Sequence, residues 1–173
     1  MSLEGKEIGY NIVLCGFMGC GKSTVGKELA KFIKMDFIDI DTYIESKENM
    51  TVSKIFKLKG EKYFRKLETK AILNVTLKPY KIIALGGGSL LNKKNVEVLK
   101  RTSKIFFLNA SKKVIMDRLK YDNSRPLLNV DEKGKVLSKL YDERFCIYRE
   151  NADITIDANG NISKIISDIL AFI

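Results

Sequence analysis

A glycine-rich segment near the amino terminus carries the strongest chemical signal in the sequence. Residues 16–24 read Gly-Phe-Met-Gly-Cys-Gly-Lys-Ser-Thr and match the pattern G-x-x-x-x-G-K-[ST]. Glycines let the backbone wrap around a phosphate so that several N–H groups point at it, and a following helix adds its positive amino-terminal end. We expect Lys22 to reach the outer phosphates of a nucleoside triphosphate and Ser23 to hold Mg²⁺. The residues expected against the nucleotide here are Gly19, Cys20, Gly21, Lys22, Ser23 and Thr24.

Two aspartates end the second apolar run, in the sequence Asp39-Ile40-Asp41. Alternation along a strand would place Asp39 and Asp41 on the same side, and ligands of open α/β sheets bind at this end of the strands. One carboxylate can hold Mg²⁺ through water, and the other can orient an acceptor hydroxyl and take its proton. The alternative is that Asp41 caps a following helix, which does not exclude such a role.

An arginine and a glycine triplet indicate how an anionic acceptor could be bound. Arg65 and Glu68 stand three residues apart in a predicted helix and can pair. Pairing would fix the guanidinium for an anionic substrate, although on spacing alone a surface salt bridge is the more frequent reason for such a pair. Residues 86–88 are all glycine and follow the third predicted strand. They would let a ligand approach the backbone closely, unless they form a plain turn.

Three further arginines surround the least regular part of the sequence. Residues 121–134 are polar, contain Pro126 and interrupt the helical pattern; a long loop in a compact domain is often a lid. Arg125 in this loop could reach phosphate charge after closure, Arg118 precedes the loop, and Arg144 on the next helix could complete an anion clamp. Each of these arginines, taken alone, is more often a surface residue.

Short apolar runs alternate with helical segments along the chain. This alternation predicts an α/β fold: a doubly wound, parallel, five-stranded sheet with helices on both faces, in one domain over residues 1–173. We predict strands over residues 10–15, 37–40, 82–85, 105–108 and 154–157. We predict helices over residues 22–33, 43–47, 52–58, 61–75, 92–101, 114–119, 136–150 and 162–172, with Gly60 at a break.

Composition narrows the chemistry and the partners. The chain of 173 residues has no histidine, so the usual general base is absent and carboxylates, Lys, Arg, backbone amides and a hard cation must act instead. The net charge of +10 could indicate a nucleic-acid partner. The excess comes mostly from lysines scattered through helical segments, and we interpret it as a solvated surface. No motif for stacking aromatic side chains on bases accompanies it, so we expect no nucleic acid.

Cysteine usage and hydropathy bear on where the protein works. Three cysteines without metal-like spacing do not predict a disulfide framework, which favours a reducing, cytoplasmic location. The amino-terminal residues lack the basic stretch and apolar core of a secretory signal. No apolar run approaches the roughly 20 residues that a membrane span needs, so we expect no membrane partner.

Taken in order, these segments resemble the shikimate kinase family, whose members are phosphate-loop metabolite kinases related to nucleoside monophosphate kinases. The resemblance covers about residues 11–157. It rests on G-F-M-G-C-G-K-S-T at 16–24, D-I-D at 39–41, G-E-K-Y-F-R-K-L-E at 60–68, G-G-G at 86–88, R-P-L-L at 125–128 and the stretch from Glu143 to Ile154.

The resemblance implies a monomeric kinase that uses ATP and Mg²⁺ to phosphorylate the 3-hydroxyl of shikimate, with an acceptor-binding region at about 40–75 and a lid at about 121–134. The catalytic residues it implies are Lys22 and Arg125, for charge on the transferred group, and Asp41, for the hydroxyl proton. Ser23 and Asp39 would hold Mg²⁺, Asp39 through water. Shikimate would be bound by Asp41, Arg65, Gly87, Gly88 and Arg144, with Glu68 supporting Arg65.

The same resemblance places Arg118 and Arg125 among the ATP-binding residues. Arg118 would lie against the adenine, with the loop after Asp157 on its other side. That loop reads Ala158-Asn159-Gly160 here and departs from the version with Arg and Pro that some members have. Adenine contacts at this loop therefore do not carry over residue by residue.

Other classes of protein remain as alternatives. A GTPase would need a D-x-x-G switch soon after the second strand and an N-K-x-D base reader, and neither is found in those places. Another metabolite or nucleoside monophosphate kinase is a closer rival, because gluconate, like shikimate, is a carboxylate with several hydroxyls. A non-catalytic relative is a further rival, but such a relative would be expected to have lost Lys22, Asp41 or Arg125, and all three are present.

Overall fold

Five parallel strands form one sheet in the order β2-β3-β1-β4-β5. The computed structural model describes residues 9–120 and 133–173. The central strand, β1, pairs with β3 on one side and β4 on the other. The strands are β1 (Asn11–Cys15), β2 (Asp36–Asp39), β3 (Lys81–Ala84), β4 (Ser103–Asn109) and β5 (Ile154–Asp157).

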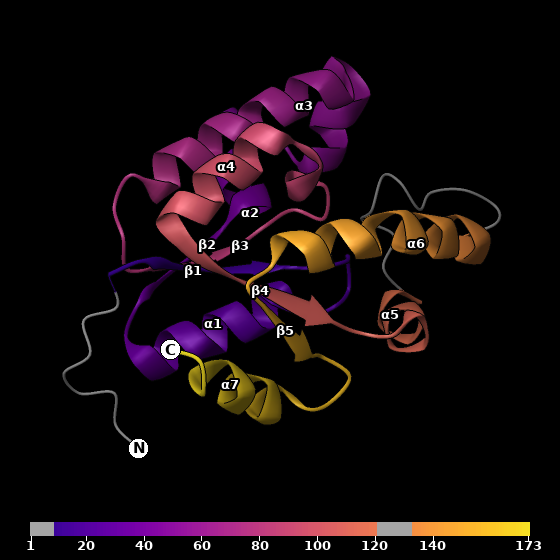
Figure 1. The fold of residues 1–173 in the computed structure, drawn as a ribbon. Coiled ribbons are helices and arrows are strands. Elements are labelled where there is room, and N and C mark those ends of the chain that lie inside the picture. Colours follow the sequence, from indigo (N-terminus) through magenta and orange to yellow (C-terminus); the bar gives the residue numbers. More distant parts are fainter. Residues whose placement is uncertain (1–8, 121–132) are drawn as a thin grey trace.

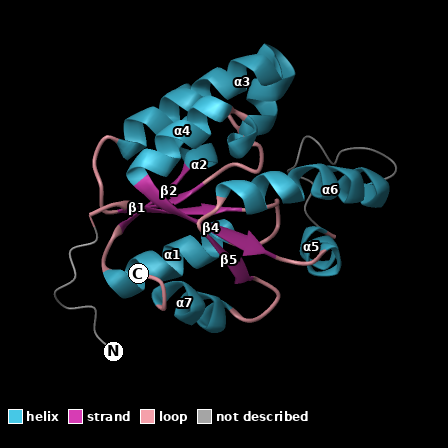
Figure 2. Ribbon diagram, in the orientation of Figure 1, coloured by secondary structure: helices cyan, strands magenta, loops and turns pink. Residues whose placement is uncertain are grey.

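The centre of the sheet is buried on both faces. All five residues of β1 are buried, as expected for the centre of a parallel sheet that helices cover on two sides. The helices are α1 (Lys22–Ile33), α2 (Ile40–Glu48), α3 (Val52–Thr76), α4 (Lys93–Thr102), α5 (Lys112–Leu119), α6 (Lys133–Asn151) and α7 (Ile162–Leu170), with a 3₁₀ turn η1 (Ser89–Leu91). Figure 1 shows α1 and α7 on one face and α2, α3 and α4 on the other, and Figure 2 shows the strands between these layers. This arrangement confirms the predicted doubly wound fold.

The helix α3 contains a break that the sequence predicts. Gly60 has φ 78° and ψ 167°, which are not helical angles, so the helix changes direction there. Only glycine adopts such a conformation readily. The break divides α3 into a short first part and a long second part, and the second part carries Arg65 and Glu68.

Most element boundaries lie within two residues of the prediction, but two helices begin three residues earlier than predicted. Helix α2 begins at Ile40, immediately after β2, and helix α6 begins at Lys133. The last two residues of the predicted lid, 133 and 134, therefore belong to a helix. The rest of the predicted lid, including Arg125, lies outside the described residues.

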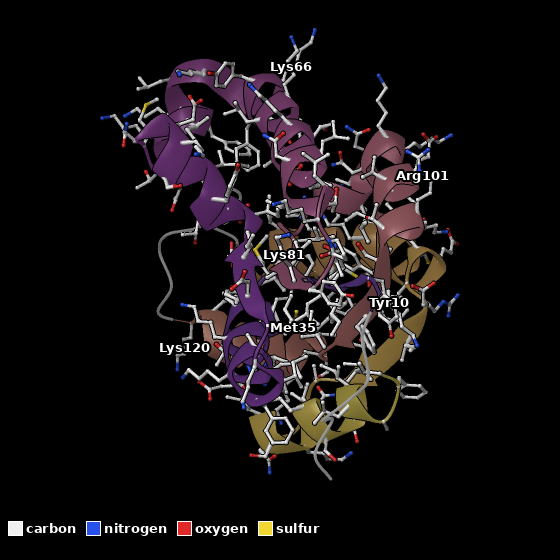
Figure 3. The ribbon with its side chains drawn as sticks, turned by 90° about the vertical axis from the view of Figure 1, so that its left-hand side faces the viewer. Tyr10, Met35, Lys66, Lys81, Arg101 and Lys120 are labelled. Carbon is white, nitrogen blue, oxygen red and sulfur yellow. The ribbon has the colours of Figure 1, made fainter. Side chains whose placement is uncertain are left out.

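Figure 3 shows the edge at which the strands begin. In Figure 3 this edge faces the viewer: Tyr10 and Met35 precede β1 and β2, and Lys81 opens β3. Lys66 and Arg101 are exposed and point away from the body of the molecule, which agrees with a solvated lysine-rich surface. Across the described residues, no helix combines the length and apolar character needed to cross a bilayer.

The three cysteines are free thiols. Cys15 and Cys20 are buried and Cys146 is exposed. Burial raises the pKa of the Cys15 thiol far above its ordinary value, so this side chain acts as a small apolar core residue.

Candidate active site

The glycine-rich loop joins β1 to α1 at the edge where the strands end. Its backbone is tightly held: Gly16 has φ 140°, and a Cβ there would lie 2.7 Å from the carbonyl oxygen of Leu108. A side chain at this position would therefore collide with β4. Helix α1 begins at Lys22 with Gly21 as its N-cap, so the free N–H groups of its first turn lie beside the loop. This is the strand–loop–helix context that the phosphate-binding motif requires.

Lys22 folds back over the loop. Its Nζ donates hydrogen bonds to the carbonyl oxygens of Gly16 and Phe17, at 2.9 and 3.0 Å. The ammonium group is thereby held directly above the loop rather than extended into solvent. A phosphate group seated in the loop would lie within reach of this charge.

Ser23 and Asp39 meet beside the loop. The Ser23 hydroxyl donates to Asp39 Oδ2 at 2.6 Å, although the two residues come from α1 and β2. The other carboxylate oxygen, Oδ1, accepts hydrogen bonds from the backbone N–H groups of Asp41 and Thr42, at 3.0 and 3.3 Å. Two hard oxygen donors next to a phosphate site fit Mg²⁺, which takes few protein ligands and completes its shell with water and phosphate oxygens.

The hydrogen bonds of Asp39 correct one sequence argument. Alternation along a strand was expected to align Asp39 with Asp41, but β2 ends at Asp39, and this residue is the N-cap of α2. Asp41 lies in the first turn of that helix. The alternative that Asp41 is the cap is therefore also wrong. An aspartate prefers to cap a helix over ending a strand, because its side chain satisfies free N–H groups of the first turn.

A cleft of about 760 Å³ opens in front of the loop. Its volume lies within the roughly 300–1,000 Å³ typical of small-molecule sites. All the loop residues expected against the nucleotide line it, together with Asp39 and Asp41. The cleft is also lined by Arg118 and Leu119 of α5 and by Ile162 and Ile165 of α7.

Arg118 joins the phosphate loop to the segment that follows β5. Its guanidinium donates to the carbonyl oxygens of Gly19 and Cys20 in the phosphate loop, at 3.3 and 3.0 Å, and to that of Ala158 after β5, at 3.2 Å. Sequence reasoning expected Arg118 near the nucleotide base but missed its bonds to the phosphate loop, because they join residues about a hundred positions apart. That Arg118 also contacts an adenine remains a prediction.

A second, smaller pocket of about 70 Å³ adjoins the cleft. Two arginines from different helices line it: Arg65 of α3 and Arg144 of α6. Its remaining lining residues are Met18, Asp41, Val52, Phe56, Phe64, Glu68, Gly86, Gly87 and Gly88. A small pocket with two guanidinium groups, aromatic walls and a carboxylate suits a compact anionic molecule that has a ring or hydroxyl groups.

Arg65 is held in this pocket by two glutamates. Its Nη1 donates to Glu68 Oε2 at 2.9 Å, and its Nη2 donates to Glu61 at 2.9 Å. Burial disfavours the charge, but the carboxylates of Glu68 and Glu61 outweigh burial and raise the pKa of Arg65. Glu68 has no exposed surface, so its pair with Arg65 is not the surface salt bridge that was the alternative. The exposed pair is the one with Glu61.

Ser89 completes the environment of Glu68. Its hydroxyl donates to Glu68 Oε1 at 2.7 Å, and its carbonyl oxygen accepts a hydrogen bond from Asn95 Nδ2 at 2.9 Å. Each carboxylate oxygen of the buried Glu68 therefore has a donor. No sequence pattern indicates this role for Ser89. The one signal was its position directly after the glycine triplet.

The space left by the glycine triplet is filled by other site residues. A Cβ on Gly88 would lie 2.5 Å from Arg65 Nη2, so only glycine lets the guanidinium lie against this turn. The carbonyl oxygen of Gly87 accepts a hydrogen bond from Arg144 Nη1 at 3.3 Å. The triplet thus positions both arginines, and a plain surface turn is not an adequate description of it.

The cleft and the pocket meet at four residues: Met18, Asp41, Val52 and Gly87. Asp41 is the one ionisable side chain among the described residues that line both. Its carboxylate therefore lies between the phosphate loop and the two arginines. Of the predicted site residues, all but Arg125 line the cleft or the pocket; Arg125 lies outside the described residues.

Glu68 and Glu61 both pair with Arg65, but only Glu68 is buried. We therefore expect replacements of these two glutamates to differ in their effect on protein stability. Glu68→Gln should lower the free energy of unfolding by about 2 kcal/mol, because it removes the charge partner inside the protein and strains the bonds to Arg65 and Ser89. Glu61→Gln, at the exposed partner, should change it by less than about 0.5 kcal/mol. Urea unfolding followed by circular dichroism measures both values. Equal effects would mean that Glu68 is not the main support of Arg65.

Comparison with known proteins decides the family. A family model described as shikimate kinase matches residues 18–173, which is most of the chain. The chain belongs to the shikimate kinase family. This membership confirms the resemblance that the sequence motifs indicated, and it removes the GTPase alternative.

Individual relatives agree with the family model. A shikimate kinase of Thermodesulfovibrio yellowstonii is 44% identical over 150 residues, which cover 87% of this chain and 86% of that protein. The solved structure of a shikimate kinase from Acinetobacter baumannii in complex with shikimate matches with a TM-score of 0.92 at 35% identity, covering 96% of this chain and 93% of that one. A gluconokinase from Sinorhizobium meliloti matches with a TM-score of 0.52 at 16% identity, covering 96% of this chain and 92% of that one, a likeness of fold alone.

Proposed function

We propose that this protein transfers the γ-phosphoryl group of ATP to the 3-hydroxyl of shikimate, giving shikimate 3-phosphate and ADP. The observation that carries the proposal is the position of Asp41, which lines both the cleft in front of the phosphate loop and the pocket with two arginines. A phosphoryl donor in the first and an acceptor hydroxyl in the second would meet beside one carboxylate. Family membership supports shikimate as the acceptor.

The acceptor is bound through its charge and its hydroxyl groups. Arg65 and Arg144 take the carboxylate of shikimate, because a guanidinium offers two parallel N–H donors to a carboxylate. Gly87 and Gly88 contribute backbone groups to the ring hydroxyls, and Asp41 accepts from the 3-hydroxyl. Glu68 holds the guanidinium of Arg65 in place. Pairing of Arg65 with a buried carboxylate at 2.9 Å supports this role.

The donor is held by the phosphate loop. Gly19, Cys20, Gly21, Lys22, Ser23 and Thr24 surround the phosphates of ATP, and Arg118 lies at the adenine end of the cleft. Ile162, on the opposite helix, offers an apolar surface there and is 40% exposed. Arg125 in the lid, outside the described residues, adds positive charge next to the transferred group.

Mg²⁺ enters as the partner of ATP. Ser23 and Asp39 would hold it, Asp39 through water, and the short contact between their side-chain oxygens supports this assignment. The ion would neutralise negative charge on the phosphates. It would thereby favour the attack of a hydroxyl oxygen on the γ-phosphorus.

The transfer itself needs positioning more than covalent catalysis. As the 3-oxygen of shikimate attacks the γ-phosphorus, the bond from that phosphorus to the β,γ-bridging oxygen breaks. The hydroxyl proton passes to a carboxylate oxygen of Asp41, and ADP leaves with the bonding electron pair. Lys22 and Arg125 stabilise the charge that develops on the transferred group. The absence of histidine from the chain is compatible with this chemistry.

Several further properties belong to the same proposal. The chain acts as a single domain and a monomer, with an acceptor-binding region at about 40–75 and a lid at about 121–134. It works in the cytoplasm and has neither nucleic acid nor a membrane as partner. The scattered, exposed lysines support the view that its positive charge is a solvated surface.

Product analysis tests the proposal. The purified protein is incubated with Mg·ATP and shikimate, and the product is examined by mass spectrometry and by proton–phosphorus correlation in NMR. The expected product carries one phosphoryl group, with the phosphorus coupled to the proton on carbon 3. Coupling to the proton on carbon 4 or carbon 5 would contradict the assigned orientation, and the absence of a phosphorylated product would contradict the function.

A further inference from the structure

The hydroxyl group of Tyr148 contacts a residue that lines the acceptor pocket, Gly87. Tyr148 stands four residues after Arg144 in α6, so the two side chains lie on the same face of the helix. Both donate to the same atom: the Tyr148 hydroxyl and Arg144 Nη1 each hydrogen-bond the carbonyl oxygen of Gly87. One carbonyl of the glycine triplet therefore links the turn to two residues of a helix more than fifty positions away in sequence.

The environment of Tyr148 determines which group donates. The side chain is 3% exposed, and its ring packs against Phe107 with the ring centroids 5.4 Å apart. Burial raises the pKa of Tyr148 far above its ordinary value, with the nearby charge of Arg144 opposing this in part. The hydroxyl thus keeps its proton at any physiological pH. A guanidinium cannot accept a hydrogen bond, so the Tyr148 hydroxyl cannot donate to Arg144. The carbonyl oxygen of Gly87 accepts from the Tyr148 hydroxyl and from Arg144.

The direction of this carbonyl fixes the direction of an amide. The peptide between Gly87 and Gly88 is trans, so the C=O of Gly87 and the N–H of Gly88 point in opposite directions. With the carbonyl oxygen held toward α6, the N–H of Gly88 points away from α6. Gly88 also lies against the guanidinium of Arg65. Rotation of this peptide would therefore change the direction of the Gly88 N–H and also disturb the position of Arg65.

Arg144 alone holds the carbonyl weakly. Its bond to Gly87 measures 3.3 Å, longer than the usual N–H···O distance of about 2.9 Å. If Arg144 turns toward a substrate carboxylate, the Gly87 oxygen would be left without a donor unless Tyr148 stays in place. The Gly87 carbonyl is partly buried, so the loss of its donor has a free-energy cost.

We infer that Tyr148 is a positioning residue for the acceptor: its hydroxyl holds the Gly87–Gly88 peptide in one orientation and keeps Arg144 beside the pocket. The inference rests on the proposed function, in which Gly87, Gly88 and Arg144 bind shikimate. Tyr148 itself does not line the cleft or the pocket among the residues described, so it acts through these neighbours.

The test is the variant Tyr148→Phe, which keeps the ring and its packing on Phe107 but removes the hydroxyl. We expect KM for shikimate to rise about tenfold, the effect of losing one well-placed buried hydrogen bond. KM for ATP and kcat should stay within about threefold, because the phosphate loop and Asp41 are untouched. Steady-state kinetics with each substrate varied in turn measures the split.

Tyr141→Phe is the matched control. Tyr141 stands on the same helix, and its hydroxyl also donates to a backbone carbonyl, that of Ala110, at 3.1 Å. We expect this variant to change KM for shikimate by less than about twofold, since Ala110 belongs to the loop after β4. A second measurement is the chemical shift of the Gly88 amide in a ¹⁵N–¹H correlation spectrum. It should shift in Tyr148→Phe and not in Tyr141→Phe, whether or not the first variant is stable enough for kinetics.

Three results would overturn the inference: an unchanged KM for shikimate in Tyr148→Phe, equal increases in KM for both substrates, or an unshifted Gly88 amide. These results differ from failure of the proposed function itself. If the wild-type protein does not phosphorylate shikimate, the proposed function is wrong. If it does, and only the shikimate-specific effect of Tyr148→Phe is missing, the positioning role alone is wrong.

Discussion

Replacing Asp41 by asparagine should lower kcat with shikimate by about a hundred- to ten-thousand-fold, the range found when a general base is removed. Asparagine has nearly the same shape but cannot take a proton from the acceptor hydroxyl at neutral pH. The affinity for ATP should stay within about twofold, because the phosphate loop, Lys22 and the Ser23–Asp39 pair are unchanged. Steady-state kinetics and calorimetric titration with ATP measure the two quantities.

Asp36→Asn is the control for this experiment. Asp36 lies on the same strand as Asp39 but is exposed at the opposite end of it, away from both the cleft and the pocket. Its replacement should leave kcat within about twofold, as expected for a surface substitution. An Asp41→Asn variant with a near-normal rate would remove the acceptor-hydroxyl role from Asp41, and a similar loss in both variants would point to a general effect of charge.

Replacing Lys22 by methionine should lower kcat/KM for ATP by about a hundred- to a thousand-fold, the cost of removing one group that stabilises charge in a transition state. Methionine keeps much of the length of the side chain and loses the ammonium group, which now lies over the loop at 2.9 and 3.0 Å from two of its carbonyl oxygens. The measurement is the initial rate of ADP release as ATP is varied at saturating shikimate.

Lys27→Met controls for the loss of a positive charge on the same helix. Lys27 is exposed on α1 and does not line the cleft. Replacement of Lys27 by methionine should leave kcat/KM for ATP within about twofold of the wild-type value. A small effect of Lys22→Met would mean that the loop binds phosphate through its backbone alone, and the role given to Lys22 would then be wrong.

The fold was predictable because local and global signals agree. The buried strands are short apolar runs bounded by polar residues, and each predicted strand overlaps the strand observed. Helix α1 has the predicted bounds, since the glycine before it and the apolar stripe within it both mark its extent. Gly60 likewise marked the break in α3. Boundaries were missed where capping decides them, as at Asp39, which ends β2 and starts α2.

The site was predictable where a motif contains its own chemistry. The phosphate loop and the pair of aspartates could be found from the residue types and spacing alone. The contacts that hold them could not, because each joins distant segments. Ser89 reaches Glu68 across 21 positions, and Tyr148 reaches Gly87 across 61. A serine after glycines or a tyrosine in a helix has no distinctive local pattern, so the sheet topology must be known before such partners can be found.

The central claim is that the pocket beside Asp41 selects shikimate as the phosphoryl acceptor. The most direct measurement is ADP release, coupled to a standard indicator reaction, with Mg·ATP and a panel of acceptors: shikimate, quinate, gluconate and AMP. The result we predict is rapid release with shikimate and only background release with the other three. Preferential release with gluconate, AMP or quinate would keep the phosphate loop and the fold but contradict the assignment of the two arginines and Asp41 to shikimate.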